Sequence, residues 1–349
     1  MKIYKNLFNK IISLANLFSA WDKFKHDKQQ KRDVQKFSWQ LEQNIFQLHH
    51  DLKYHMYKHQ PYTSFYINDP KQRHIHKASV RDRVLHHAVF SILNPLFEET
   101  FISHSFSCRI DKGTHAGVDA LESIMRAVSK NYTVPCFALK CDVQKFFASV
   151  DHYILINIIS KRIKDDNVMW LLKIIIESFV SPLFSLFSSK GLPIGNLTSQ
   201  LFANIYLNEL DQFVKHQLGV KHYVRYTDDF VLVANNEAQA YSFINPISRF
   251  LEQKLALRLH PKKIIVRKIR QGVDFLGYVV LPHHRVLRSK TKTRMFRKLH
   301  QRINQYHNKI VGQQTIDQAL QSYLGVLSHA NTHELSLELK NRYWFWLSE

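Results

Sequence analysis

The sequence is poor in cysteine and in acidic residues, and it lacks any long apolar run. Its three cysteines, Cys108, Cys136 and Cys141, are odd in number and show no C-x-x-C spacing. This pattern argues against a disulfide framework and against a cysteine zinc site, and it favours a reducing cytoplasm. No apolar run reaches the roughly 18 residues of a membrane span, so we expect no transmembrane helix and no membrane partner.

The first residues, MKIYKNLFNKIISLANLFSAW, place basic residues before an apolar stretch, as signal peptides do. Lys10 and Asn16 interrupt that stretch, while Leu7, Ile11 and Leu14 repeat at helical spacing. The segment therefore predicts an amphipathic helix. The chain shows no internal repeat, low-complexity tract or Gly/Ser linker.

Histidine is abundant, with 21 residues, but no pair has a carboxylate or thiol at a familiar metal-ligand spacing. The H-E-x-x-H motif is also absent. We expect the histidines to serve as surface and nucleic-acid contacts and expect no zinc site.

Positive charge dominates the composition. The chain has 49 Lys and Arg against 28 Asp and Glu, a formal net charge of +21, together with 24 Phe, 15 Tyr and 5 Trp. A basic surface with many aromatic rings suits phosphate backbones and stacked bases, although a basic soluble protein without a nucleic-acid partner is the plain alternative. Hydrophobic residues make up 45% of 349 residues, enough for a large core divided among two or three subdomains.

Two adjacent carboxylates stand in HYVRYTDDFVLVAN, residues 222–235. Val224 and Tyr226 before them and Phe230 after them favour strands, so Asp228-Asp229 is predicted to connect the two strands of a hairpin. Like charges this close repel unless a hard cation such as Mg²⁺ neutralises them. The alternative is a solvated turn.

A partner carboxylate is expected in CFALKCDVQKFFASVDH, residues 136–152. The apolar run from Cys136 to Val143 predicts a strand that ends near Asp142, and Ser149 or Asp151 can cap the following helix. Two such strands set side by side would form a cage for two Mg²⁺ ions, with Mn²⁺ as a substitute. A two-metal site of this kind catalyses nucleotidyl transfer.

Seven blocks, in this order, resemble the successive sequence blocks of bacterial reverse transcriptases over about residues 70–280: RHIHKASVRDRVLHHAV, NPLFEETFISHSFSCRIDKGTHAG, LKCDVQKFFASVDH, GLPIGNLTSQLFANIYLNELD, YVRYTDDFVLV, HPKKIIVRKI and FLGYVV. Within that group II intron-like class, IGNLTSQ at 194–200 and the N-terminal stretch are similar to reverse transcriptases of diversity-generating retroelements.

The resemblance implies an α+β fold, a right-hand polymerase with fingers, an antiparallel-sheet palm and a helical thumb. It implies an RNA-directed DNA polymerase that copies a template RNA into cDNA, with low fidelity and adenine-directed mutagenesis that diversifies a target gene. The alternatives are another bacterial reverse transcriptase, of the retron, phage-defence (antiviral) or group II intron type, or a non-catalytic RNA-binding scaffold. The short sequence after the predicted thumb argues against the intron type, and the intact aspartates argue against the scaffold.

The resemblance also assigns roles to individual residues. Asp142, Asp228 and Asp229 match the catalytic, metal-binding carboxylates, and the Val143 carbonyl completes the metal shell. The nucleotide-binding residues are Arg73, Arg109, Phe147, Ile194, Gly195 and Lys263. Lys77 or Arg81 is a further contributor, and Lys262 is the alternative to Lys263. The primer grip is Phe275, Leu276, Gly277 and Tyr278.

Two of these residues predict substrate selection. Phe147 lies where the family places a bulky side chain beneath the incoming sugar, which leaves no room for a 2′-hydroxyl and favours deoxynucleotides over ribonucleotides; core packing is the alternative for Phe146 or Phe147. Ile194 replaces a glutamine of many relatives and so removes a hydrogen bond near the incoming nucleotide, which predicts lower fidelity. A harmless apolar replacement is the alternative.

Four regions are expected: an N-terminal helical extension at 1–70, fingers at 70–135, a catalytic palm at 136–284 and a thumb at 285–349. Basic residues follow position 285, with Met295, Leu299 and Ile303 at helical spacing, as in a thumb helix along a duplex. The expected partners are template RNA, the RNA/cDNA duplex and dNTPs. The family further implies a small basic accessory protein and a structured non-coding RNA.

Overall fold

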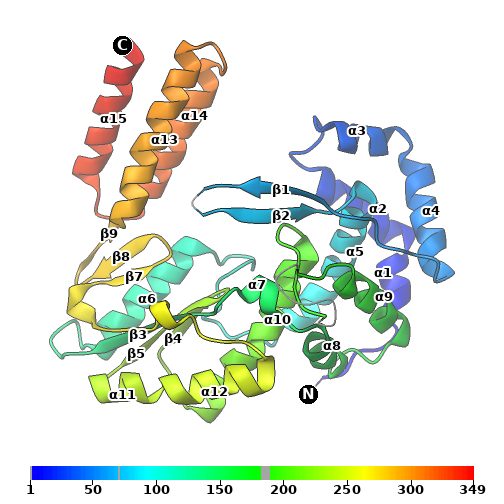
Figure 1. Ribbon diagram of the computed structural model, residues 1–349, viewed down its shortest axis with the longest axis horizontal. Helices are drawn as coiled ribbons and strands as arrows, with labels where there is room; N and C mark the ends of the chain where they lie inside the picture. Colours follow the sequence, from blue (N-terminus) through cyan, green and yellow to red (C-terminus); the bar gives the residue numbers. More distant parts are fainter. Residues whose placement is uncertain (1, 70, 182–188) are drawn as a thin grey trace. The chain divides into compact units, whose positions relative to one another are not determined.

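The computed structural model describes residues 2–69, 71–181 and 189–349 (Figure 1). The chain divides into two compact units, each assembled from three separate segments. Unit 1 is Met1–Ser103, Asp142–Gly219 and Asn245–Lys262, and unit 2 is His104–Cys141, Val220–Ile244 and Lys263–Glu349. Each unit has its own buried core.

Unit 1 is mainly helical. Its helices are α1 Phe8–Ile12, α2 Leu14–Lys25, α3 Arg32–Trp39, α4 Leu41–Lys53, α5 Val80–Glu98, α7 Phe146–Ser149, α8 His152–Ser160, α9 Asp166–Glu177, α10 Leu197–Gln212 with a π-helical end Phe213–Gln217, and α12 Ile244–Leu255. The predicted cap of α8 is Asp151, whose carboxylate accepts a hydrogen bond from the Ile154 amide at 3.1 Å.

The single amphipathic helix predicted at the N-terminus is instead two helices, α1 and α2. Ser13 separates them with a non-helical ψ of 140°, and its hydroxyl accepts a hydrogen bond from the Asn16 amide at 3.3 Å. Serine at this position caps the second helix and so favours a break over a continuous helix. Ile11 and Leu17 still lie in the core, as the spacing predicts.

Within unit 1, helices α5 and α10 contact each other, and α2 packs against α5. The Ser79 hydroxyl caps α5 by accepting a hydrogen bond from the Asp82 amide at 3.2 Å. The strands β1 Thr63–Ile67 and β2 Arg73–Lys77 form an antiparallel hairpin with Phe65 paired with Ile75.

Unit 2 contains a four-stranded sheet in the order β4-β5-β3-β6. The strands are β3 Phe137–Asp142, β4 Tyr223–Tyr226, β5 Asp229–Ala234 and β6 Ile265–Lys268. Helix α6 Thr114–Val128 packs on β4 and β5, and α11 Glu237–Ser242 packs on β5 and β6. The strand pairs β4–β5 and β3–β6 are antiparallel.

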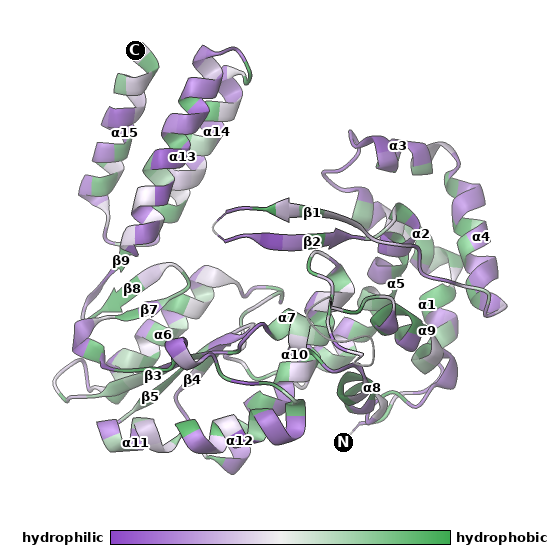
Figure 2. Cartoon of the chain, in the orientation of Figure 1, coloured by the Kyte–Doolittle hydropathy of each residue, from purple (hydrophilic) through white to green (hydrophobic). Residues whose placement is uncertain are grey.

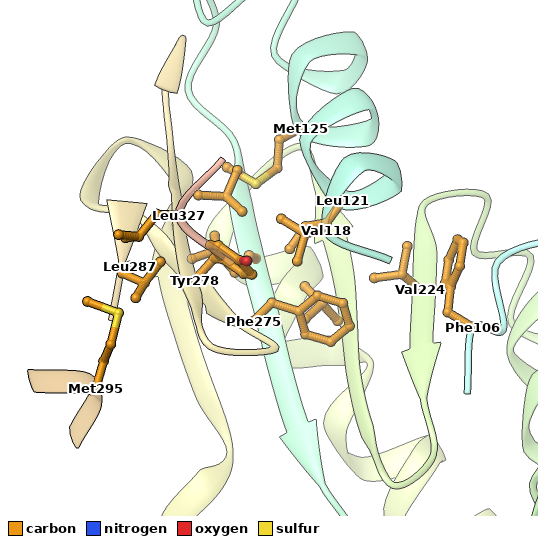
Figure 3. Close-up of a cluster of buried hydrophobic side chains, with 14 of the residues drawn as sticks. Phe106, Val118, Leu121, Met125, Val224, Phe275, Tyr278, Leu287, Met295 and Leu327 are labelled. Carbon is orange, nitrogen blue, oxygen red and sulfur yellow. The ribbon is translucent and has the colours of Figure 1, made fainter. Parts of the chain in front are cut away.

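A second sheet of unit 2 has the order β7-β8-β9, with strands Val273–Phe275, Tyr278–Leu281 and His284–Leu287. Phe275 and Tyr278 point into a core shared with α6, where Val118, Leu121 and Met125 also lie (Figure 3). This packing anchors the β7–β8 hairpin to the same helix that covers the four-stranded sheet.

Three helices follow: α13 Ser289–His307, α14 Gln313–Leu327 and α15 His333–Ser348. The helix predicted from about residue 285 begins later, because His284–Leu287 pairs with β8 as a strand. Met295, Leu299 and Ile303 are buried along one face of α13, as their spacing predicts. Figure 2 shows hydrophilic residues predominating on this helix, with hydrophobic positions between them. No helix in the described residues is long and apolar enough to span a bilayer.

Candidate active site

Two adjacent aspartates lie at the turn of the β4–β5 hairpin. Tyr226 pairs with Asp229, so Thr227 and Asp228 form the two-residue turn. The hairpin is as predicted, but the turn is displaced by one residue, since Asp229 is the first residue of β5. Thr227 has a φ of 52°, which is rare for a β-branched residue and suits the first position of a tight hairpin turn. Asp228 and Asp229 are both half-buried.

Arg225 holds this turn from inside the protein. Its side chain is fully buried, and its guanidinium donates hydrogen bonds to the Thr227 carbonyl at 3.1 Å and the Ser105 hydroxyl at 3.0 Å. The Thr227 hydroxyl donates to the Ser107 hydroxyl at 2.7 Å. The backbone of Phe106 donates to the Arg225 carbonyl at 2.9 Å. These contacts hold the unusual backbone of the turn in place.

Asp142 is the last residue of β3, as predicted, and β3 is the neighbour of β5 in the sheet. The two carboxylate-bearing strands are therefore side by side. The Asp142 carbonyl accepts a hydrogen bond from the His260 amide at 2.8 Å, and the Gln144 amide donates to the Arg258 carbonyl at 2.8 Å. These two hydrogen bonds pair the backbone at the end of β3 with residues 258–260.

Phe147 follows on the short helix α7. Lys145 precedes that helix with a φ of 47°, and the backbone therefore bends sharply after β3. Phe146 is 2% exposed and belongs to the core, whereas Phe147 is only half-buried. The two phenylalanines thus differ in environment, and core packing accounts for Phe146. The Phe147 carbonyl accepts a hydrogen bond from the Leu192 amide at 2.6 Å, which joins α7 to the loop before α10.

The same loop contacts strand β2. The His76 amide donates to the Ile194 carbonyl at 3.1 Å, and the Asn196 side-chain amide donates to the His76 carbonyl at 3.3 Å. Gly195 has a φ of +114°, and a Cβ there would lie 3.0 Å from the Ile75 side chain. The positive φ favours glycine, and any side chain there would also press against Ile75. Arg73 begins β2 and is exposed. Unit 1 thus brings together β2, the Ile194-Gly195 loop and α7.

Residues 58–280 match the family described as reverse transcriptase (RNA-dependent DNA polymerase). The chain belongs to the reverse transcriptase family. It is 25% identical to Protein YkfC of Escherichia coli over 68% of this chain and 69% of that protein. It is 24% identical to the group II intron-encoded protein LtrA of Lactococcus lactis over 72% of this chain but only 51% of LtrA.

A solved structure of apo telomerase from Candida tropicalis shares the fold, with a TM-score of 0.53 and 14% identity over 83% of this chain and 59% of that chain. The fold is therefore the α+β right-hand polymerase fold, with antiparallel sheets as expected. At this identity, the likeness concerns the fold alone.

Two further predicted residues of the reverse transcriptase domain, Arg109 and Lys263, lie in unit 2. The Arg109 guanidinium donates to the Ser105 carbonyl at 2.7 Å, so Arg109 is tied to the segment that supports the Thr227-Asp228 turn. Lys263 ends the 3-10 helix Pro261–Lys263 and is half-buried, whereas Lys262 is exposed. Arg73 lies in unit 1.

The predicted primer grip of the reverse transcriptase is the β7–β8 hairpin. Leu276 and Gly277 form its turn, with φ values of 51° and 95°. Phe275 and Tyr278 are buried, and the Tyr278 hydroxyl donates to the Val326 carbonyl at 3.0 Å. The two rings therefore stabilise the hairpin from within, and the turn between them is half-buried.

The proposed metal donors of the reverse transcriptase are oxygen atoms, the ligand type that Mg²⁺ takes. Asp142, Asp228 and Asp229 are half-buried, so their charges are partly withdrawn from water and favour neutralisation by a cation. Val143 forms an antiparallel bridge with Leu259, and in that register its own carbonyl points away from residues 258–260. The donor set suits Mg²⁺ or Mn²⁺ by chemical type, although no group of three His, Cys, Asp or Glu side chains within the described ranges is close enough to hold a metal ion.

Sequence reasoning missed Arg225, Ser105 and Ser107 of the reverse transcriptase domain. It also missed Lys140, whose ammonium lies 3.3 Å from an Asp229 carboxylate oxygen. The available signal was a cation inside an otherwise apolar strand, since Arg225 lies between Val224 and Tyr226 and Lys140 between Leu139 and Cys141. A cation at such a position requires a buried partner.

Proposed function

We propose that this chain is an RNA-directed DNA polymerase that copies a template RNA into cDNA by two-metal nucleotidyl transfer. The observation that carries the proposal is the pair of neighbouring strands β3 and β5, one ending at Asp142 and the other beginning at Asp229. Membership of the reverse transcriptase family supports this use of the carboxylates.

Asp142, Asp228 and Asp229, with the Val143 carbonyl, would hold two Mg²⁺ or Mn²⁺ ions. When bound, such ions activate the primer 3′-hydroxyl and stabilise charge on the transferred phosphoryl group and on the leaving pyrophosphate. The contribution of the protein is to hold the carboxylates in place before the substrate arrives. At the turn, Arg225, Ser105 and Ser107 serve this purpose. Ser105 accepts a hydrogen bond from Arg225, and Ser107 accepts one from Thr227.

The nucleotide site is proposed at β2, the Ile194-Gly195 loop and α7. Arg73 offers a planar guanidinium that can bind triphosphate oxygens through two hydrogen bonds. The half-buried ring of Phe147 would lie beneath the sugar and exclude a 2′-hydroxyl. Arg109 and Lys263 are proposed as further phosphate contacts, with Lys263 assisting the departing pyrophosphate.

We propose that residues 1–70 are an N-terminal extension, 70–135 the fingers, 136–284 the palm and 285–349 the thumb. The β7–β8 hairpin would hold the primer terminus. Helix α13 would lie along the RNA/cDNA duplex, because its exposed face is basic and phosphates attract such a face. Its cations are Lys290, Lys292, Arg294, Arg297, Lys298 and Arg302.

Within the family, we propose a diversity-generating retroelement enzyme with adenine-directed errors, a structured template RNA and a small basic accessory protein. Ile194 supports this choice, because its side chain offers no hydrogen bond beside the proposed nucleotide site. A group II intron-type enzyme is the second candidate, favoured by the similarity to LtrA. Sequencing the cDNA separates the two: errors concentrated at template adenines favour the first, and rare or uniform errors favour the second.

The test of polymerisation uses a primed RNA template, dNTPs and Mg²⁺. Asp228→Asn should reduce primer extension by at least roughly a hundredfold, because charge stabilisation at such a site contributes several kcal/mol. Asp22→Asn is the matched control, since Asp22 is an exposed aspartate of α2 whose carboxylate pairs with the Lys25 ammonium at 2.7 Å. Normal extension by Asp228→Asn would contradict the proposed site. RNA binding, measured in parallel, shows that the variant is folded.

A further inference from the structure

Lys140 lies on the same face of β3 as Asp142, two residues earlier in the strand. Side chains alternate along a strand, so Leu139 and Cys141 point to the opposite face, where both are fully buried. The Lys140 side chain is 17% exposed and must therefore find its partners inside the protein.

The Lys140 ammonium has three anionic or polar oxygen partners. It lies 3.3 Å from an Asp229 carboxylate oxygen and 3.6 Å from an Asp274 carboxylate oxygen, and it donates a hydrogen bond to the Asp274 carbonyl at 2.7 Å. Asp229 begins β5 at the catalytic turn, and Asp274 is the middle residue of β7. One cation thus bridges the turn and the proposed primer-grip hairpin.

The link continues to the start of α13. The Arg288 guanidinium forms an ion pair with the Asp274 carboxylate, and the Arg288 amide donates to the Gly277 carbonyl at 3.0 Å. Charges alternate along Asp229, Lys140, Asp274 and Arg288, and all four residues belong to unit 2. Because these side chains are partly withdrawn from water, their attractions are screened less than those of surface pairs.

We infer that Lys140 is a positioning residue of the polymerase reaction. It fixes the position of the Asp229 carboxylate relative to the primer-grip hairpin, and its positive charge competes with the divalent cations for that carboxylate. Asp142 and Asp228 then carry the larger share of metal binding. The inference rests on the proposed polymerase function. It predicts that changes at Lys140 and at its second partner, Asp274, shift the metal requirement in opposite directions.

Lys140→Met removes the competing cation, so the half-saturating Mg²⁺ concentration for primer extension should fall about fivefold. The extension rate at saturating Mg²⁺ and dNTP should also fall, roughly tenfold, because Asp229 and the primer-grip hairpin are no longer tied together. Asp274→Asn leaves Lys140 to act on Asp229 alone, so the half-saturating Mg²⁺ concentration should rise. Lys140→Arg should restore most of the rate. An ion pair that only stabilises the fold would not produce opposite shifts.

Lys161→Met is the control, because Lys161 pairs with Glu209 at 3.0 Å elsewhere in the protein; its Mg²⁺ dependence should be that of the wild type. Mn²⁺ affinity, measured by calorimetry on the full chain, needs no polymerisation. Tighter Mn²⁺ binding by Lys140→Met supports the inference even if the wild type extends no primer, which would overturn only the proposed function. Unchanged Mn²⁺ affinity and Mg²⁺ dependence in Lys140→Met, or in Lys140→Gln if the first variant does not fold, would overturn the inference.

Discussion

The buried guanidinium of Arg225 donates a hydrogen bond to the carbonyl of Thr227, the residue that precedes the Asp228-Asp229 pair. Arg225 lies on β4, so this hydrogen bond joins the turn to the strand that precedes it. A second hydrogen bond, to the Ser105 hydroxyl, fixes the guanidinium from the neighbouring segment. The position of Asp228 therefore depends on a side chain three residues earlier.

Arg225→Met should disturb the turn without creating a large cavity. Loss of the two charged hydrogen bonds should lower the free energy of unfolding by about 3 kcal/mol and the primer-extension rate by at least roughly tenfold. Chemical denaturation and single-turnover extension measure the two effects. Arg126→Met, which removes an exposed arginine on α6 that contacts the Asn131 side chain, should change neither. Full activity of Arg225→Met would show that the turn keeps its conformation without the hydrogen bonds of Arg225.

Phe147→Ala should admit ribonucleotides. The half-buried ring is the proposed barrier to a 2′-hydroxyl, and its removal should raise the relative use of ribonucleotides by roughly tenfold or more. The measurement is kcat/KM for a ribonucleotide and its deoxy counterpart on one primed RNA. Phe46→Ala, at an exposed phenylalanine of α4, is the control and should leave the ratio as it is. An unchanged ratio in Phe147→Ala would remove the proposed sugar selection from this residue.

Ile194→Gln should increase fidelity. The new amide can form a hydrogen bond near the incoming nucleotide, and a bond of about 1 kcal/mol should reduce misincorporation by roughly fivefold to tenfold. Deep sequencing of cDNA gives the error frequency at each template base. If the retroelement proposal is correct, the decrease should be concentrated at template adenines. Ile310→Gln, at an exposed isoleucine after α13, should not alter the error pattern.

Stability should fall in mild acid because of His86. Burial, then the nearby His59, His87 and Arg83, lowers the pKa of His86 from 6.5 to about 3. The unfolded chain binds a proton below pH 6.5 and the folded chain does not, so the free energy of unfolding decreases as the pH falls from 6.5 towards 3. This contribution is fully present above pH 6.5.

The measurement is the melting temperature between pH 7.5 and 5 (roughly the range in which an ordinary histidine titrates). His86→Leu should weaken the acid dependence, because leucine fills much of the site and binds no proton. His26→Leu, at a histidine with a largely exposed side chain, should retain the wild-type dependence. Equal acid dependence in the wild type and His86→Leu would assign the effect to other groups.

Local patterns predicted much of the reverse transcriptase domain. The strand ending at Asp142, the hairpin at Asp228-Asp229 and the buried stripe of α13 all occur, because alternation and helical spacing act over a few residues. Two departures from the predicted helices also have local causes. Ser13 caps a second helix, and His284–Leu287 joins a sheet through pairing with β8.

The partners of the Thr227-Asp228 turn and of Asp229 could not be predicted in this way. Ser105 and Arg225 are 120 residues apart in sequence, and Lys140 and Asp274 are 134 apart. A hydrogen bond or ion pair at such separation gives no repeating pattern in the sequence, because its geometry depends on how strands and helices pack. The sequence showed the cationic residues Arg225 and Lys140 within strands, but not the groups that they contact.

The sequence by itself determined the family, the strand-borne carboxylates and the basic, aromatic character of the chain, since motif order and composition are properties of the chain alone. Only the tertiary structure decided that Phe146 is core while Phe147 is half-exposed, that Arg225 closes the turn, and that Lys140 bridges Asp229 and Asp274. The reason is physical: burial and electrostatic attraction depend on distances in space, and folding brings together residues that the sequence keeps far apart.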